Sequence, residues 1–254
     1  MLKGVLTNAE RHEQMAKSMH LPMLKKKGKF NDRRMTIACY GPSLADTWRQ
    51  LKHPIMTVSG AHDYLVERGV IPDFHVDCDP RPHKAEMLRK PQKETKYLMA
   101  SVCHPNFWET LKGKNVKVWH LVNGDDFETV AWVAQHHPEG MESLIGGGSS
   151  VGMRAMNVSA ALGFRRFDIH GMDCSFTNNR HAGAHTGKDQ VKIMVNVGLR
   201  TFQTTQQMLQ AAIEMENFID TQDAEVVFYG DGLIRKLLSN SRNYYEKRSS
   251  GLDR

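Results

Sequence analysis

The feature that most constrains the fold is a regular alternation, from Met35 onward, of short apolar runs with segments of helical periodicity. The apolar runs end in glycine, proline, serine or aspartate, and in most of the following segments apolar residues recur every three or four positions. Strand followed by helix, repeated, is typical of a parallel sheet covered on both faces. We therefore predict an α/β, Rossmann-like fold with a mostly parallel sheet and helices on both faces.

The predicted strands are Met35–Tyr40, Ile55–Ser59, Phe74–Cys78, Tyr97–Val102, Val116–Leu121, Ser143–Ile145, Phe167–His170 and Val226–Tyr229. The predicted helices between them are Leu44–Leu51, Ala61–Arg68, Arg81–Leu88, Asn106–Leu111, Asp125–His136, Ser150–Leu162 and Thr204–Thr221. An amphipathic helix at residues 5–19 precedes a basic connector. We divide the chain into this helix and connector (1–34), a main domain (35–240) and a C-terminal tail (241–254).

The composition favours a soluble, cytoplasmic protein. Of the 254 residues, 40% are hydrophobic and 24% are charged, and no run of 18 apolar residues occurs that would span a membrane. The first residues carry charges where a signal peptide needs an apolar core. The four cysteines are widely spaced within or just after apolar runs, which predicts reduced core thiols and not a disulfide framework or a zinc site.

The charge balance leaves two interpretations open. The formal net charge is +6, and much of the excess lies in KKKGKFNDRR at 25–34. Such a segment either contacts phosphate groups of a polyanionic partner or is simply a solvated linker. No nucleic-acid-binding motif accompanies it.

The first candidate site is Gly41-Pro42-Ser43, directly after a predicted strand. In parallel α/β sheets, ligands bind beyond the carboxyl ends of the strands. Glycine lets the backbone approach a ligand closely, and Ser43 can cap the next helix or offer its hydroxyl and N–H groups to a phosphate. A tight turn with a helix cap explains the same residues equally well.

Asp77 and Asp79 lie at the end of the predicted strand Phe74–Cys78, two residues apart. An extended backbone therefore points both carboxylates the same way. Two adjacent carboxylates need a neutralising partner. Mg²⁺ or Mn²⁺ bridging to nucleotide phosphates would serve, and so would Arg81 or His83. Alternatively, Asp79 caps a helix that begins at Pro80.

The sharpest local signal is IGGGSSVGMRAM at 145–156, in which Gly146, Gly147 and Gly148 precede Ser149 and Ser150. Three glycines permit a backbone nest, and the following helix presents its positive end. The stretch matches neither the P-loop nor the dinucleotide-binding pattern. It therefore favours binding of an anion or a sugar over a plain turn.

A fourth loop contains Asp173, and the polar segment 178–190 beyond it is long enough to form a lid over a site. Asp173 is able to accept hydrogen bonds from a base, a ribose or an acceptor hydroxyl, or else it caps a turn. In the segment, His181 and His185 are candidate catalytic or substrate-contacting residues, and Lys188 is a candidate phosphate contact. Histidines without any role are common on protein surfaces.

A resemblance to the 6-hydroxymethylpterin diphosphokinase MptE-like family spans residues 35–235. It rests on the stretches GPSL, GVIPDFHVDCDP, GGGSSVGMRAMNVSAALGFRRFDIHGMDCSF, HAGAHTGKDQ and VVFYGDGLI in this order. The family includes archaeal pterin enzymes, flagellin-glycosylation accessory proteins and many phage proteins. CYGPSL is also similar to the nucleotide-binding turn of bacterial lipooligosaccharide sialyltransferases, which use a CMP donor.

The resemblance implies a transferase whose nucleotide lies among the four loops, surrounded by Gly41, Pro42, Ser43, Asp77, Asp79, the loop 146–150 and Asp173. Taken with the residue patterns above, the candidate catalytic residues are Asp77, Asp173, His181 and His185, and Mg²⁺ or Mn²⁺ is expected at Asp77 and Asp79. Glycosyl transfer from a nucleotide sugar to a hydroxyl is the leading hypothesis. The alternatives are pyrophosphoryl transfer from ATP to a hydroxymethylpterin, and a non-catalytic nucleotide- or glycan-binding protein. The basic character also suggests a large anionic acceptor, such as DNA with a hydroxymethylated base. The oligomeric state stays open.

Overall fold

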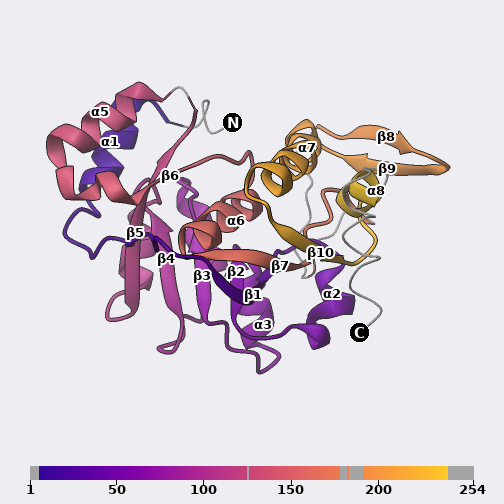
Figure 1. Ribbon diagram of the computed structural model, residues 1–254. Coiled ribbons are helices and arrows are strands. Elements are labelled where there is room, and N and C mark those ends of the chain that lie inside the picture. Colours follow the sequence, from indigo (N-terminus) through magenta and orange to yellow (C-terminus); the bar gives the residue numbers. More distant parts are fainter. Residues whose placement is uncertain (1–5, 125, 178–181, 183–190, 240–254) are drawn as a thin grey trace.

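An eight-stranded sheet forms the centre of the computed structural model (Figure 1), which describes residues 6–124, 126–177, 182 and 191–239. Its strands are β1 (Asn31–Ala38), β2 (Ile55–Val58), β3 (Phe74–Asp77), β4 (Lys96–Ala100), β5 (Asn115–Val122), β6 (Leu144–Gly146), β7 (Phe164–His170) and β10 (Glu225–Tyr229). Every predicted strand is present, and neighbouring strands all pair in parallel. The predicted α/β, Rossmann-like fold is confirmed.

The order of the strands creates a switch point at β1. The sheet runs β10-β7-β1-β2-β3-β4-β5-β6, so that the chain builds outward from β1 to β6 and then returns to the other side of β1 for β7 and β10. Ile37 of β1 pairs with Met56 of β2 on one side and with Ile169 of β7 on the other. Because the loops after β1 and β7 leave the sheet at this point, they lie where open α/β sheets bind ligands.

The helices are α1 (Asn8–Ala16), α2 (Leu44–Thr47), α3 (Ala61–Val66), α4 (Asn106–Thr110), α5 (Phe127–His136), α6 (Val151–Ala161), α7 (Gln206–Thr221) and α8 (Leu233–Ser239). Short 3₁₀ helices span Trp48–Gln50, Pro82–Met87 and Pro138–Ser143. In α6 the Ser150 hydroxyl caps the helix by accepting from the Met153 N–H, and in α7 Thr205 does the same for Met208.

Both faces of the sheet are covered, as side chains of β2 show. Ile55 packs in a cluster with Ala61 and Leu65 of α3. The next residue, Met56, points the other way, and its sulfur lies 3.2 Å from the Ser159 hydroxyl of α6. Adjacent residues of one strand thus bury themselves under different helices, which explains why the strands read as continuous apolar runs.

The N-terminal helix and its connector pack onto the sheet domain. The side chain of Arg11 in α1 contacts Asp126 and Thr129 at the start of α5. Further along, Leu24 donates a backbone hydrogen bond of 2.7 Å to Val118 O, which extends the edge of the sheet beside β5. Among the described residues, no helix is long and apolar enough to cross a membrane.

The four cysteines are free; Cys39, Cys78 and Cys103 are buried and Cys174 is partly buried, as predicted. Other features differ from the sequence analysis. An antiparallel hairpin of β8 (Ile193–Val197) and β9 (Arg200–Thr204) projects from the sheet domain beside α7 (Figure 1) and was not predicted, nor was α8. The predicted helix Arg81–Leu88 is a 3₁₀ helix that begins at Pro82, so Asp79 does not cap it.

Candidate functional site

The loops after β1 and β7 lock together at the switch point. The Gly41 N–H donates to Gly171 O at 2.8 Å, and the Ser43 N–H donates to Asp173 Oδ2 at 3.0 Å. A Cβ atom on Gly41 would lie 2.3 Å from Gly171 O and 2.4 Å from Asp173 Oδ2, so only glycine allows this approach. The Gly-Pro-Ser turn is therefore packed against another loop, because Gly41 allows the loop after β1 to contact the loop after β7.

A third loop, after β10, completes this junction. A Cβ atom on Gly230 would lie 2.4 Å from the Ser43 hydroxyl, and the Gly230 φ of +102° is one that side chains disfavour. The described residue Ala182 also reaches the junction, where its N–H donates to Tyr40 O at 3.1 Å. We call Gly41, Pro42, Ser43, Asp173 and Gly230 the β1–β7 junction.

The carboxyl group of Asp173 is buried in this junction. Burial raises its pKa, hydrogen bonds from Ser43 oppose the rise, and the nearby Asp46 and Asp231 add to it. Ser43 itself makes no side-chain cap for α2, contrary to one of the two sequence interpretations. The buried carboxyl group of Asp173 therefore holds the loops after β1 and β7 together.

Asp77 and Asp79 lie at the carboxyl end of β3, where Asp77 ends the strand and its carboxylate turns back toward the chain. Asp77 Oδ1 accepts from the N–H groups of Cys78 at 2.7 Å and Asp79 at 3.0 Å. Burial, followed by the nearby Asp79, raises the pKa of Asp77 to about 6. At neutral pH this carboxyl is mostly ionised, and its pKa lies close enough to neutrality for it to exchange protons there.

Asp79 has its own cation, Arg81. The Arg81 Nε and Nη2 atoms donate to the two carboxylate oxygens at 2.8 and 2.5 Å. Burial raises the pKa of Asp79, but the hydrogen bonds from Arg81 outweigh it and the pKa is lowered overall. Within the described residues, no three His, Cys, Asp or Glu side chains gather as a metal site. The pair as it stands does not favour a resident metal ion, and a divalent cation arriving with a nucleotide stays a prediction.

The glycine-rich loop contacts α7. Gly147 and Gly148 have φ values of +85° and +90°, which explains the need for glycine there. The Ser149 N–H donates to Glu214 Oε2 at 2.7 Å, and the Gln207 side chain donates to Ser149 O at 2.6 Å. A carboxylate of the protein itself therefore occupies one donor of this predicted anion-binding loop.

An open cavity of about 1090 Å³ lies beside the glycine-rich loop. It is bordered by Gly147, Gly148 and Ser149, by Asn123 after β5, and by residues of α1, α5 and α7. One residue that the sequence analysis missed, Arg154 of α6, also lines it and is only 3% exposed. The available signal was a lone cation in the otherwise apolar stretch VGMRAM.

The three remaining sequence candidates, His181, His185 and Lys188, lie outside the described residues. A histidine that the sequence analysis did not select, His170, ends β7 directly before the junction. Its ring stacks on Tyr229 with centroids 4.1 Å apart, and burial lowers its pKa to about 4. It is therefore neutral at physiological pH.

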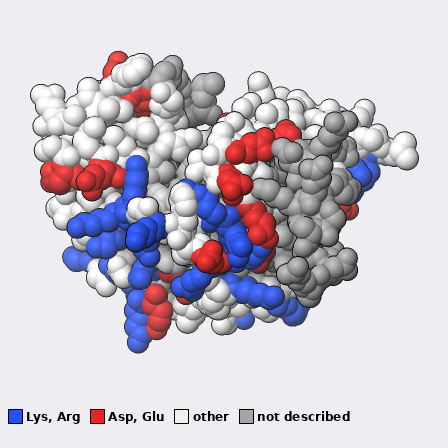
Figure 2. Space-filling model, in the orientation of Figure 1, with Lys and Arg blue, Asp and Glu red and all other residues white. Residues whose placement is uncertain are grey.

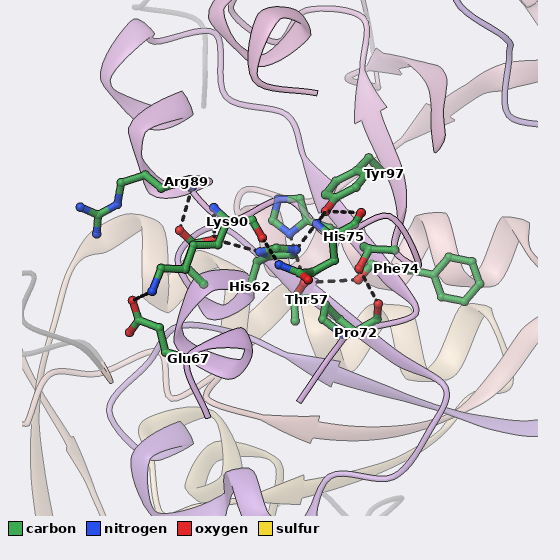
Figure 3. Close-up of polar contacts among 12 residues, drawn as sticks. Thr57, His62, Glu67, Pro72, Phe74, His75, Arg89, Lys90 and Tyr97 are labelled. Carbon is green, nitrogen blue, oxygen red and sulfur yellow. Dashed lines mark hydrogen bonds and ion pairs between the residues drawn. The ribbon is translucent and has the colours of Figure 1, made fainter. Parts of the chain in front are cut away.

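A second buried polar cluster lies on the face of the sheet that α3 covers (Figure 3). His75 of β3 contacts the Thr57 hydroxyl at 3.1 Å, and Tyr97 of β4 contacts His62 of α3 at 3.2 Å. The carboxylate of Asp63, paired with His62, accepts from the Arg89 N–H at 2.7 Å. This cluster anchors the segment after Leu88 to α3, and we assign it a structural role.

The fold and these loops define an α/β protein with four chain segments at the carboxyl edge of a parallel sheet. The family described as "6-hydroxymethylpterin diphosphokinase MptE-like" matches residues 7–179, and the chain belongs to that family. No curated protein matches its sequence.

Among solved structures, the MAf glycosyltransferase from Magnetospirillum magneticum AMB-1 has a similar fold, with a TM-score of 0.66 and 16% identity. The match covers 88% of this chain and 36% of that one, so this chain spans about a third of the length of that protein. At this identity the likeness concerns the fold.

Proposed function

We propose that the chain is a nucleotide-dependent glycosyltransferase, which moves a sugar from a nucleotide-sugar donor to a hydroxyl acceptor. The observation that carries the proposal is the β1–β7 junction, where Ser43 and Asp173 meet at the switch point of the sheet. A ligand at such a point contacts both loops at once. The family membership and the fold shared with a glycosyltransferase add support.

In this proposal Asp77 is the general base that accepts the proton of the acceptor hydroxyl. Its pKa of about 6 leaves it ionised but still basic near pH 7, which is the condition that a general base requires. The sugar then forms its bond to the acceptor oxygen while the bond to the nucleotide phosphate breaks. The nucleotide leaves with the bonding electron pair on its phosphate, and in this proposal that phosphate lies above the junction loops at the carboxyl edge of the sheet.

The Asp77→Asn variant tests this role. We expect a loss of turnover of about 10²- to 10⁴-fold with nucleotide-sugar donors, and loss of a rise in activity through pH 6. The matched control is Asp220→Asn, which changes an exposed aspartate near the end of α7. Full activity of Asp77→Asn would exclude Asp77 as the base.

A second candidate function is the diphosphokinase activity in the family description. Its substrates would bind at the same carboxyl edge of the sheet. It predicts that ATP and a hydroxymethylpterin yield AMP, whereas the glycosyltransferase releases the donor nucleotide. Binding of nucleotides without turnover of either kind would indicate a non-catalytic accessory protein.

The acceptor in this proposal is a large anionic molecule, for which DNA with a hydroxymethylated base is the candidate. Lys25, Lys26, Lys27 and Lys29 of the connector are exposed and form no ion pair within the described part of the chain. Figure 2 shows Lys and Arg side chains gathered on the face that this connector crosses. Binding to DNA that weakens steeply with salt supports this choice, and no binding removes it.

A further inference from the structure

Two buried arginines line the cavity beside the glycine-rich loop, and they differ in whether a carboxylate pairs with them. Arg11, 9% exposed, is paired with Asp126 and also donates to Thr129. Arg154, 3% exposed, has no carboxylate partner among the residues that the structure describes. The charge of Arg11 is therefore balanced inside the protein, and the charge of Arg154 is not.

The two side chains that the structure records in contact with the Arg154 guanidinium are neutral. Its Nη2 lies 3.5 Å from Asn123 Oδ1, which is a long hydrogen bond. The Cys78 thiol also contacts it, and burial raises the pKa of that thiol to about 12, so that it stays protonated. Nη1 is buried and has no hydrogen-bond partner in the described chain. A buried, unbalanced guanidinium is costly to folding, and such groups persist where a ligand supplies the missing charge.

The rest of the cavity wall is polar and suits a polyhydroxylated ligand. It includes three carboxylates, each of which has a partner in the protein: Asp126 pairs with Arg11, Glu128 accepts from Asn8 and Glu214 accepts from the Ser149 N–H. Amide side chains of Asn123, Gln206 and Gln210 line it, and amides both donate to and accept from hydroxyl groups. The ring of Phe127, 77% exposed, stands at its border and offers a flat apolar face of the kind on which sugar rings stack. The volume of about 1090 Å³ accommodates a ligand of the size of a nucleotide sugar.

We propose that this cavity binds a sugar that carries one oxyanion, and that Arg154 binds the oxyanion. Arginine suits this task because its planar guanidinium donates two parallel hydrogen bonds to a carboxylate or a phosphate. The proposal deepens the proposed glycosyltransferase function and rests on it for the role of the ligand in turnover. Binding itself is measurable without turnover.

The test is a thermal-shift titration of the full chain with glucuronate, glucose 6-phosphate and neutral glucose at matched ionic strength. We expect at least one charged sugar to raise Tm by about 3 to 6 °C at ten times its Kd, and glucose to have no effect. A response to glucuronate alone indicates a carboxylate ligand, and a response to glucose 6-phosphate alone indicates a phosphate ligand.

Arg154→Met removes the charge at nearly equal volume. We expect this variant to lose the charged-sugar shift and to keep or exceed the Tm of the unliganded wild type, because it removes an unbalanced buried charge. Arg154→Lys should retain part of the shift. The control Arg34→Met should do the opposite: it lowers Tm because Asp168 and Glu225 lose this partner, but it keeps the shift, since Arg34 of β1 does not line the cavity.

Three binding results would overturn the proposal: no shift with either charged sugar, an equal shift with glucose, or a shift that survives in Arg154→Met. A large fall in the Tm of unliganded Arg154→Met would also overturn it, because Arg154 would then be a paired structural residue. Failure of the wild type to transfer sugar would refute the proposed function and leave this binding result intact.

Discussion

Gly41→Ala should destabilise the protein strongly although its backbone conformation suits alanine. The new Cβ would lie 2.3 Å from Gly171 O, a main-chain atom that cannot rotate away. Relief requires the two loops to separate, which breaks the 2.8 Å bond from the Gly41 N–H and the 3.0 Å bond from Ser43 to Asp173. Losing one ordinary hydrogen bond and one to a carboxyl group costs about 2 to 4 kcal/mol.

The assay is urea unfolding of wild type, Gly41→Ala and the control Gly28→Ala. A Cβ on Gly28 meets nothing within 4 Å, so this control should change the free energy of unfolding by less than about 0.5 kcal/mol or raise it slightly. The Gly41→Ala Tm should fall by about 4 to 16 °C. If Gly41→Ala is as stable as Gly28→Ala, the loops after β1 and β7 are not in contact and the reasoning fails.

Two further predictions concern pH and metal. Burial, aided by the nearby His62, holds the pKa of His75 well below its usual 6.5. Below pH 6.5, His75 therefore binds a proton in the unfolded chain but stays neutral in the folded protein. The free energy of unfolding should therefore fall on acidification below pH 6.5, and His75→Gln should reduce that slope by up to about 1.4 kcal/mol per pH unit. The free energy of unfolding is measured by urea titration at several pH values. If it depends on pH equally in the wild type and in His75→Gln, burial of His75 is not the cause. Because Arg81 already occupies both oxygens of Asp79, EDTA should shift the Tm of the unliganded protein by less than about 1 °C. A larger fall would reveal a resident ion.

The sheet could be predicted because its strands are buried on both sides. Ile55 and Met56 are both apolar although they face different helices, and such runs followed by turn residues leave few alternatives. The β8–β9 hairpin escaped prediction because it stands apart from the main sheet and buries only one face, where Val197 and Phe202 pack against Leu233 of α8. Its strands therefore lack the continuous apolar runs of the main sheet, and Met194 and Leu199 are exposed.

The sequence predicted which loops contain the candidate site residues, but it did not predict which of these residues contact one another. Position after a strand identified Ser43 and Asp173 separately, but their hydrogen bond joins residues 130 positions apart. The bond from Ser149 to Glu214 depends in the same way on where α7 packs. Arg154 escaped notice because a cation on a helix normally faces solvent, and only the packing of α6 shows that it is buried.

The central claim is that a nucleotide sugar contacts the loops after β1 and β7 together. Amide hydrogen exchange of the full chain, with and without CMP- and UDP-sugars, tests it directly. The account predicts slower exchange in residues 39–46 and 171–176 with the same donor. Protection confined to the amino ends of the strands, or no protection with any donor, would contradict it.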